Sequence, residues 1–241
     1  MVKSNIFSTD EFATIESKTT AFLNSYPDFL SSQTARSTRT VGDAIEGIIA
    51  KEFPNILGGT CKEYSSDFAR RAMADLAFVD VQGLYYVVDV KTHRLDTKFN
   101  MPNLTSIRRI ARFYEDDNNY FVLLMVKYNI DQTKIKIHKT HFIPIEFLSW
   151  DCLTIGALGW GQIQIANSNN ITINKGYSRA KWMVDLCDIV IEFYSKEIGK
   201  IGERTGYFEE VKVYWEEKLA NDLRRPLNLS GTVRLGPSNR K

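Results

Sequence analysis

Two acidic residues and a lysine lie in one apolar stretch, with a spacing that can bring their side chains together. Asp89 and Lys91 are separated by one residue, so in a strand both project from the same face while Val90 points into the core. If this run pairs with the preceding apolar run through a turn at 81–83, Asp75 lies opposite Asp89. We therefore expect two carboxylates and an amine to meet at the end of a buried hairpin. Their desolvation there is costly unless a metal, mutual pairing or a substrate offsets it.

The chemistry that such a group supports is phosphodiester hydrolysis. Opposed carboxylates, here Asp75 and Asp89, are hard oxygen ligands for Mg²⁺, which keeps coordination positions for water and phosphate oxygens. The ion polarises the phosphoryl group and lowers the pKa of a bound water. Lys91 can stabilise the developing negative charge. Taken singly, each of the three is more often part of an ordinary strand-end ion pair, but together on one hairpin they favour a site.

Glu46 is a fourth catalytic candidate, and it lies on a helix predicted from Thr40 to about Phe53. The helix is indicated by a capping box at Thr40 and Asp43, by Pro54 after its last turn, and by apolar residues at helical spacing. Glu46 lies off that apolar stripe, where it can reach a metal directly or through water. Asp43 and Glu52 compete with it for this role, and a plain surface glutamate is the alternative.

The other elements follow from the same kind of pattern. Two strands between Met73 and Thr92 surround the loop Val81-Gln82-Gly83, in which glycine suits the positive φ of the third position. A further helix is predicted after Pro102-Asn103, with Asn103 as its cap. Strands are then expected at 121–128, 135–143 and 162–166, and helices at 178 to about 196 and 208 to about 223, separated by Gly199, Gly202 and Gly206.

These elements predict an α/β fold with a central mixed, mainly antiparallel sheet of about five strands flanked by helices. The 241 residues are expected to form a single domain, with an N-terminal arm at 1–39, a core at 40–223 and a basic tail at 224–241. The tail is either a flexible arm that touches DNA or a solubilising end. The three cysteines, Cys61, Cys152 and Cys187, have neither a disulfide pattern nor the spacing of a zinc site, and we expect them to be buried.

Composition excludes several classes of protein. With 44% hydrophobic and 25% charged residues, a chain that is disordered, coiled coil or collagen-like throughout does not fit. The formal net charge is +2, so a nucleic-acid partner would need locally clustered basic residues. The longest apolar stretch, 121–126, is too short to span a membrane, and the N-terminus lacks the pattern of a secretory signal. We therefore expect a cytoplasmic protein without membrane contact.

The order of the motifs resembles the PD-(D/E)xK nucleases and, within them, the blunt-cutting type II restriction endonucleases. Ala74-Asp75 followed by Asp89-Val90-Lys91 matches the family motif, with alanine where the family usually has proline. Asp-Val-Lys-Thr at 89–92, Pro102-Asn103, Gln162-Ile163-Gln164 and the segment 178–182 occur in the family's order and at similar spacing. The resemblance covers roughly Thr40 to Lys196.

This resemblance implies a restriction-endonuclease-like fold and a role for each matched residue. Asp75 and Asp89 would be metal ligands, Lys91 would assist the attacking water, and Mg²⁺ would be the cofactor. Asn100 and Asn103 occupy the segment that carries the recognition loop in the family, and an asparagine amide can bond adenine in bidentate fashion. The partners implied are double-stranded DNA and a second copy of the chain. Segment 1–39 lies outside the resemblance, and we expect it to contribute to dimerisation and to DNA contact.

Further DNA-contact candidates are basic or polar residues around the asparagines. Basic residues can neutralise backbone phosphates, although a solvated basic face is an equal alternative. Polar side chains on the 162–166 strand can line a groove, or can simply keep a sheet edge soluble. These candidates are His93, Arg94, Lys98, Arg36, Arg39, Arg108, Gln162 and Gln164. No nucleotide cofactor is expected, because the glycine-rich stretch 155–161 lacks the spacing of a phosphate-binding loop.

Three functions remain open from the sequence. The first is a homodimeric type II restriction endonuclease that cuts both strands of a short palindrome, leaving blunt ends with 5′-phosphates. The second keeps the same site in a repair nuclease or junction resolvase that prefers a DNA structure to a sequence. The third is a DNA-binding module without catalysis, in which the hairpin acids are a structural pair.

Overall fold

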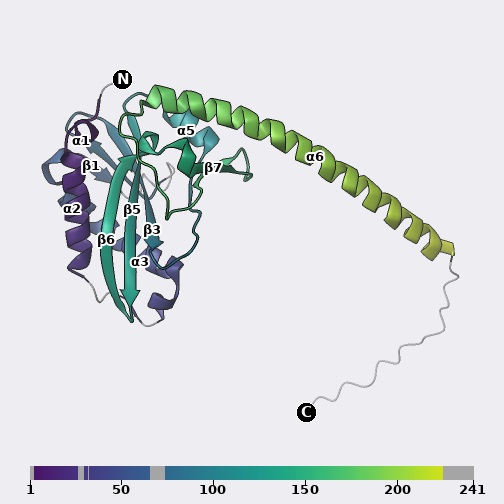
Figure 1. Ribbon diagram of the computed structural model, residues 1–241, viewed down its shortest axis with the longest axis horizontal. Helices are drawn as coiled ribbons and strands as arrows, with labels where there is room; N and C mark the ends of the chain where they lie inside the picture. The colour runs from purple at the N-terminus through teal and green to yellow at the C-terminus, as the bar shows by residue number, and fades with distance from the viewer. Residues whose placement is uncertain (1–2, 27–29, 32, 66–73, 225–241) are drawn as a thin grey trace, which may run out of the picture. The chain divides into compact units, whose positions relative to one another are not determined.

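The computed structural model describes residues 3–26, 30–31, 33–65 and 74–224 (Figure 1). The chain divides into two compact units, Met1–Val190 and Ile191–Lys241. The first unit is an α/β structure that holds both sheets and most of the helices. The described part of the second unit is helical. The basic tail predicted at 224–241 lies outside the described residues from residue 225 onward.

A five-stranded mixed sheet forms the centre of the first unit, which confirms the predicted α/β class and its mainly antiparallel sheet. The strand order is β1-β2-β3-β5-β6, and β3 and β5 are the parallel pair among antiparallel neighbours. The strands span Cys61–Ser65 (β1), Leu76–Asp80 (β2), Tyr85–Arg94 (β3), Asn119–Asp131 (β5) and Lys134–Pro144 (β6).

The β2–β3 hairpin has the predicted register. Leu76 pairs with Val88, so the residue before Leu76 lies beside Asp89. Gly83 has a φ of 82° in the loop, which is the left-handed conformation that favours glycine. The Asp80 carboxylate accepts hydrogen bonds from two loop amides, those of residues 82 and 84, and so holds the turn closed. Met73, the predicted strand start, lies outside the described residues.

Helices α2 (Glu11–Asn24) and α3 (Thr38–Leu57) cover one face of the large sheet, with the short helix α1 (Asn5–Ser8) beside them. In Figure 1, α2 runs alongside β6. The helix predicted from Thr40 is α3, but the Ser37 side chain caps it by accepting from the Thr40 amide. Pro54 lies inside its last turn and does not follow it. Helix α2 falls in the segment that the sequence predicted as an arm.

The opposite face of the sheet is covered by α5 (Ile107–Phe113), by the first turns of α6 and by a second sheet. This sheet has the order β4-β8-β7 and contains Asn103–Ser106, Gln162–Ile165 and Leu153–Gly156. The strand predicted at 162–166 therefore exists, but it belongs to this sheet and β1 is the fifth strand of the large one. Ser106, and not Asn103, caps α5, because Asn103 starts strand β4.

Helix α6 spans Arg179–Arg224 as one continuous helix, which corrects the two separate helices predicted around the glycines. None of the described helices is long and apolar enough to cross a membrane. The cysteine prediction also needs correction, because Cys152 is buried but Cys61 is half-buried and Cys187 on α6 is exposed.

Candidate active site

The end of the β2–β3 hairpin brings together the three residues that the sequence singled out. Asp89 on β3 accepts a hydrogen bond at Oδ1 from Lys91 Nζ, at 2.6 Å. Asp75, just before β2, accepts at Oδ2 from the Val90 amide, at 2.7 Å. Because Val90 lies between the other two along β3, this bond fixes the Asp75 carboxylate next to them. The predicted convergence of two acids and an amine is present.

Burial sets the electrostatics of Asp89. Its side chain is 6% exposed, and its Oδ2 has no hydrogen-bond partner among the described residues. Burial raises the pKa of this carboxyl to about 7, and the negative charges of Asp75 and Glu46 also raise it, whereas the Lys91 ammonium lowers it. Near neutral pH the carboxyl is therefore divided between its two forms, and a bound cation would favour the charged form.

The residues present fit Mg²⁺ better than a metal that needs an all-protein cage. Within the described part of the chain, no group of three or more His, Cys, Asp or Glu side chains is arranged to hold a metal. Mg²⁺ is commonly bound through one or two carboxylates, with water and phosphate oxygens filling its octahedron. Asp75 and Asp89 supply two hard oxygen donors, and the unpartnered Asp89 Oδ2 is a free acceptor for such an ion.

Helix α3 brings an acidic residue to the same place through a close approach to β3. A Cβ added at Gly42 would lie 2.9 Å from Thr92 Oγ1, so glycine allows the helix to lie directly against the strand. Glu46, one turn further along α3, then lines the same groove as Lys91. Asp43 lines it too, whereas Glu52 instead accepts from the Asn55 side chain and is not part of the groove.

A groove of about 830 Å³ extends from this point and receives several of the predicted DNA-contact residues. Helix α3, the end of β3 and the segment leading to β4 form its walls. Four predicted residues contribute to its lining, namely Arg39, Arg94, Asn100 and Asn103. The groove therefore combines the α3 acids and Lys91 of the hairpin with two guanidinium groups and two amides, which can contact phosphates and base edges.

The remaining predicted contacts are not part of this groove. Arg36 and Lys98 are exposed, and Arg108 on α5 lies over the ring of Trp160, 4.9 Å from its centroid. His93 is buried rather than at the surface, and both of its ring nitrogens are engaged. Burial lowers the pKa of its imidazole.

His93 instead belongs to a polar cluster that no sequence pattern predicts. Its ring contacts Ser168 Oγ and Asn169 Oδ1, both at 2.8 Å. The Asn169 side-chain amide donates to the carbonyl oxygens of Thr97 and Lys98. The Ser168 backbone amide donates to the Asn100 carbonyl. This cluster connects residues 97–100, which lead toward β4 along the groove, to the end of β3. Its members lie about seventy residues apart along the chain, so no local pattern links them.

The second sheet places two predicted DNA-contact residues in direct contact. Gln164 Nε2 on β8 donates to Asn103 Oδ1 on β4, at 2.5 Å. Gly156 makes room for this side chain, because a Cβ there would lie 2.6 Å from Gln164 Oε1. Gln162 lies two residues away on the same strand, opposite Ser106. Asn103 and Gln164 thus form a joined pair of amides at the rim of the groove.

We compared the chain with protein-family models and with curated protein sequences. No protein-family model matches the chain, and no curated protein matches its sequence. The likeness to nucleases therefore rests on the motifs of the sequence, and the structural support comes from the hairpin and the groove.

Proposed function

We propose that this chain is a Mg²⁺-dependent type II restriction endonuclease with a restriction-endonuclease-like fold. The observation that carries the proposal is the buried Asp89 carboxylate, which is paired with Lys91 and lies beside Asp75, and one of whose oxygens has no partner among the described residues. A buried acid with an open oxygen next to a second acid suits a cation. Lys91 and Glu46 extend that site into a groove with basic and amide side chains.

The chain's own residues perform defined parts of the hydrolysis. Asp75 and Asp89 would hold Mg²⁺, which when bound polarises the phosphoryl group and lowers the pKa of a coordinated water. Lys91 orients the attacking water and balances charge on a nonbridging oxygen. The water gives up one proton and its oxygen bonds to phosphorus as the bond from phosphorus to the 3′ oxygen breaks. The 3′ oxygen takes up one proton, so the two proton transfers balance. The products are a 5′-phosphate and a 3′-hydroxyl.

The groove supports DNA as the substrate. Arg39 and Arg94 line the groove and can neutralise phosphates, Arg94 in exchange for its ion pair with Asp96, and Asn100 and Asn103 can read base edges. The chain's net charge of +2 does not attract DNA by itself, so these local charges carry the interaction. The proposal includes a homodimer, in which each copy places one site on one strand of a palindrome. It also places the protein in the cytoplasm.

Digestion of a sequenced plasmid with Mg²⁺, followed by mapping of the ends, tests this function. The expected result is a set of discrete fragments with blunt ends and 5′-phosphates, lost when EDTA removes the metal. Cutting restricted to branched or damaged duplex would instead indicate a repair nuclease or resolvase. Binding without cleavage of any of these DNAs, and without uptake of Mg²⁺, would show a non-catalytic DNA-binding module and overturn the proposal.

A further inference from the structure

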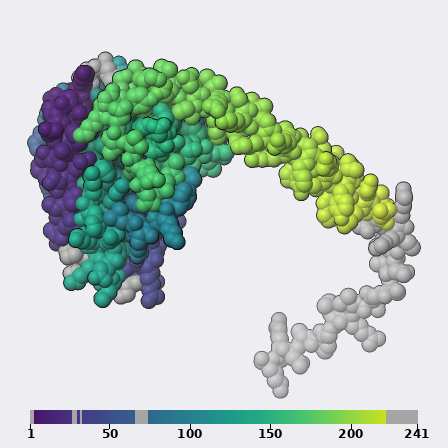
Figure 2. Space-filling model, viewed as in Figure 1, coloured from purple at the N-terminus to yellow at the C-terminus, as the bar shows by residue number. Residues whose placement is uncertain are grey.

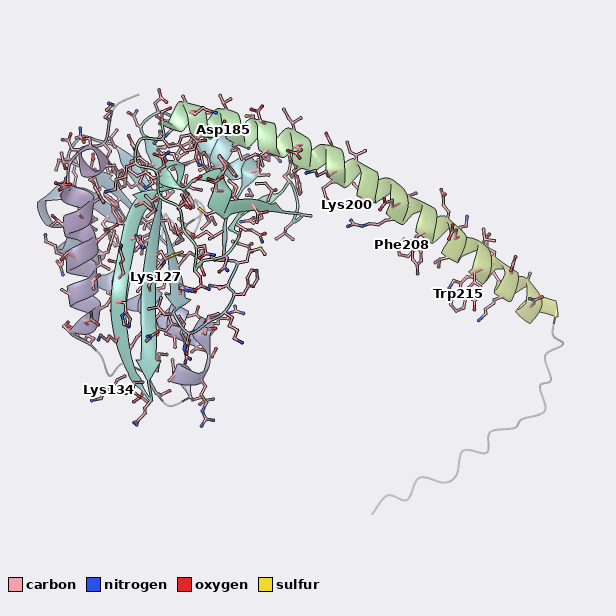
Figure 3. The ribbon with its side chains drawn as sticks, in the orientation of Figure 1. Lys127, Lys134, Asp185, Lys200, Phe208 and Trp215 are labelled. Carbon is pink, nitrogen blue, oxygen red and sulfur yellow. The ribbon has the colours of Figure 1, made fainter. Side chains whose placement is uncertain are left out.

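The described part of the second unit, residues 191–224, is a single helix that exposes many large apolar side chains. Figure 2 shows this stretch in yellow-green as one rod of side chains. Phe208 and Trp215, seven residues apart, project from the same side of the helix in Figure 3. They are 65% and 60% exposed. Apolar surface of this extent is typical of an interface.

The apolar side chains follow a repeat of seven residues. If Ile191 is assigned to position a of the heptad abcdefg, most a and d positions are apolar over four heptads. The a positions are Ile191, Ile198, Thr205, Lys212 and Leu219, and the d positions are Tyr194, Ile201, Phe208 and Trp215. A repeat of 3.5 residues keeps one seam facing a partner helix when the two helices supercoil.

A shallow, open depression lies along the middle of this seam. An open groove of about 420 Å³ follows the middle of the seam and is lined by Ile201, Arg204, Thr205, Phe208, Glu209 and Lys212. In the heptad these six residues occupy positions d, g, a, d, e and a, which are the positions that form the holes of a coiled coil. The groove therefore lies where a side chain of a second helix would insert.

Three glycines weaken this helix where it stands alone in water. Gly199, Gly202 and Gly206 fall within eight residues, and a Cβ at any of them would meet open space in this chain. Glycine weakens a helix exposed to water, and an isolated helix in water is marginal even without glycine. All three glycines lie at b or e positions, so they leave the apolar seam intact.

We infer that residues 191–219 of α6 form a parallel two-stranded coiled coil with the same segment of a second copy of this chain. A second copy is the expected partner because a heptad seam of this kind is complementary to an identical seam. Lys212 at an a position favours two strands, since a charged residue at an a position helps to specify oligomer state and register. Its ammonium lies 3.6 Å from the Glu216 carboxylate at the rim of the seam.

Charge complementarity favours the parallel orientation. In a parallel pair, a g residue faces the e residue five positions later on the other helix, so Arg204 meets Glu209 of the partner subunit. Among the described residues, neither Arg204 nor Glu209 forms an ion pair within its own chain. In an antiparallel pair, e positions face e positions, which would set Glu209 and Glu216 against like charges.

The inference supplies the dimer that the proposed function requires, but it does not depend on that function. Its test measures mass and not cleavage, so each proposal can fail alone. Sedimentation equilibrium of the full chain over micromolar concentrations should give twice the 27.6 kDa of one chain. A monomer throughout that range, or a trimer or tetramer, would overturn the inference.

Ile201→Glu locates the interface, and Val213→Glu is its matched control. The two residues are 57% and 55% exposed on the same helix, but Ile201 is a d residue of the seam and Val213 is a b residue outside it. Ile201→Glu should weaken the dimer by roughly 100-fold or more, because both copies lose a buried side chain. An unchanged dimer in Ile201→Glu and also in Phe208→Glu would show that the copies meet elsewhere.

A charge exchange tests the orientation. Arg204→Glu should weaken the dimer, because it places two acids against each other on both sides of a parallel pair. Adding Glu209→Arg to the same chain should restore the parent dissociation constant. If the double variant is weaker than the single one, the helices do not run parallel in this register and the inference is wrong.

Discussion

Burial of the Asp89 carboxyl opposes its ionisation, and this opposition is the physical basis of the candidate site. The pKa of the carboxyl is about 7 in the folded chain, against an ordinary value of 3.8. Between about pH 4 and pH 7 the folded state therefore binds the proton more tightly than the unfolded state does. The free energy of unfolding contributed by this group falls as pH rises through that window, and it stays low above it. A cation at Asp89 would offset the loss.

We predict that Mg²⁺ raises the melting temperature more at about pH 8 than at about pH 6, because the ion binds the ionised carboxylates. Differential scanning fluorimetry with and without the metal measures this. Asp89→Asn should abolish the effect, whereas Asp131→Asn, at an exposed position on β5, should retain it. Without metal, Asp89→Asn should raise the free energy of unfolding by about 2 kcal/mol at about pH 8. A metal effect that is equal at both pH values would contradict this account of Asp89.

At the scale of elements, the contact between α3 and β3 decides which acid joins the hairpin. Gly42 lets the helix lie against Thr92, and Glu46 reaches the groove one turn further on. Glu46→Gln should reduce the Mg²⁺-dependent cleavage rate by roughly 10- to 100-fold, because the groove loses a carboxylate close to the metal site. Glu52→Gln, on the same helix but outside the groove, should cleave at the parent rate. Equal rates for the two variants would exclude Glu46 from catalysis.

Strand β6 provides a separate test of pH dependence, away from the groove. Burial lowers the pKa of His141 to about 4, and the charges of Lys139 and Lys127 lower it further. Since the folded pKa is below the ordinary 6.5, the stability that this group contributes is complete above about pH 6.5 and is lost as pH falls toward 4. His141→Gln should remove about 2 kcal/mol of the change in unfolding free energy between about pH 7 and pH 4.5, measured with urea. His138→Gln, at an exposed position on the same strand, should leave that change intact.

The sequence predicted those elements whose signal is local. Helix α3 and the β2–β3 hairpin follow from apolar spacing and a glycine turn, and the hairpin alone places Asp75 beside Asp89. Strand β1 was missed because it is a short, largely exposed edge strand without an apolar alternation. The sequence predicted two helices where α6 is continuous, because glycine lowers helix propensity. Local propensity does not include contacts with another helix. The cluster of His93 with Ser168 and Asn169 depends on a tertiary contact that no local pattern encodes.

At the scale of the whole molecule, cleavage of both strands requires two active sites on one DNA. If residues 191–219 join the two copies, Ile201→Glu should leave each site intact but uncouple the two cuts. We predict that this variant converts supercoiled plasmid mainly to nicked circles at low enzyme concentration, while the parent and Val213→Glu produce linear DNA directly. Agarose gels of a time course measure the two products. If Ile201→Glu also produces linear DNA directly, the coiled coil is not required for coordinated cleavage of the two strands.

We propose that Asp75, Asp89 and Lys91 act together in metal-dependent cleavage of DNA, and Lys91→Ala is the decisive variant. The matched control is Lys134→Ala, at an exposed position at the start of β6 that is labelled in Figure 3. In a plasmid assay with Mg²⁺, Lys91→Ala should lose cleavage by roughly 1,000-fold or more while it still binds DNA, because Lys91 acts on the developing charge. Lys134→Ala should cleave at the parent rate. Cleavage by Lys91→Ala at the parent rate would exclude Lys91 from catalysis and overturn the proposed active site.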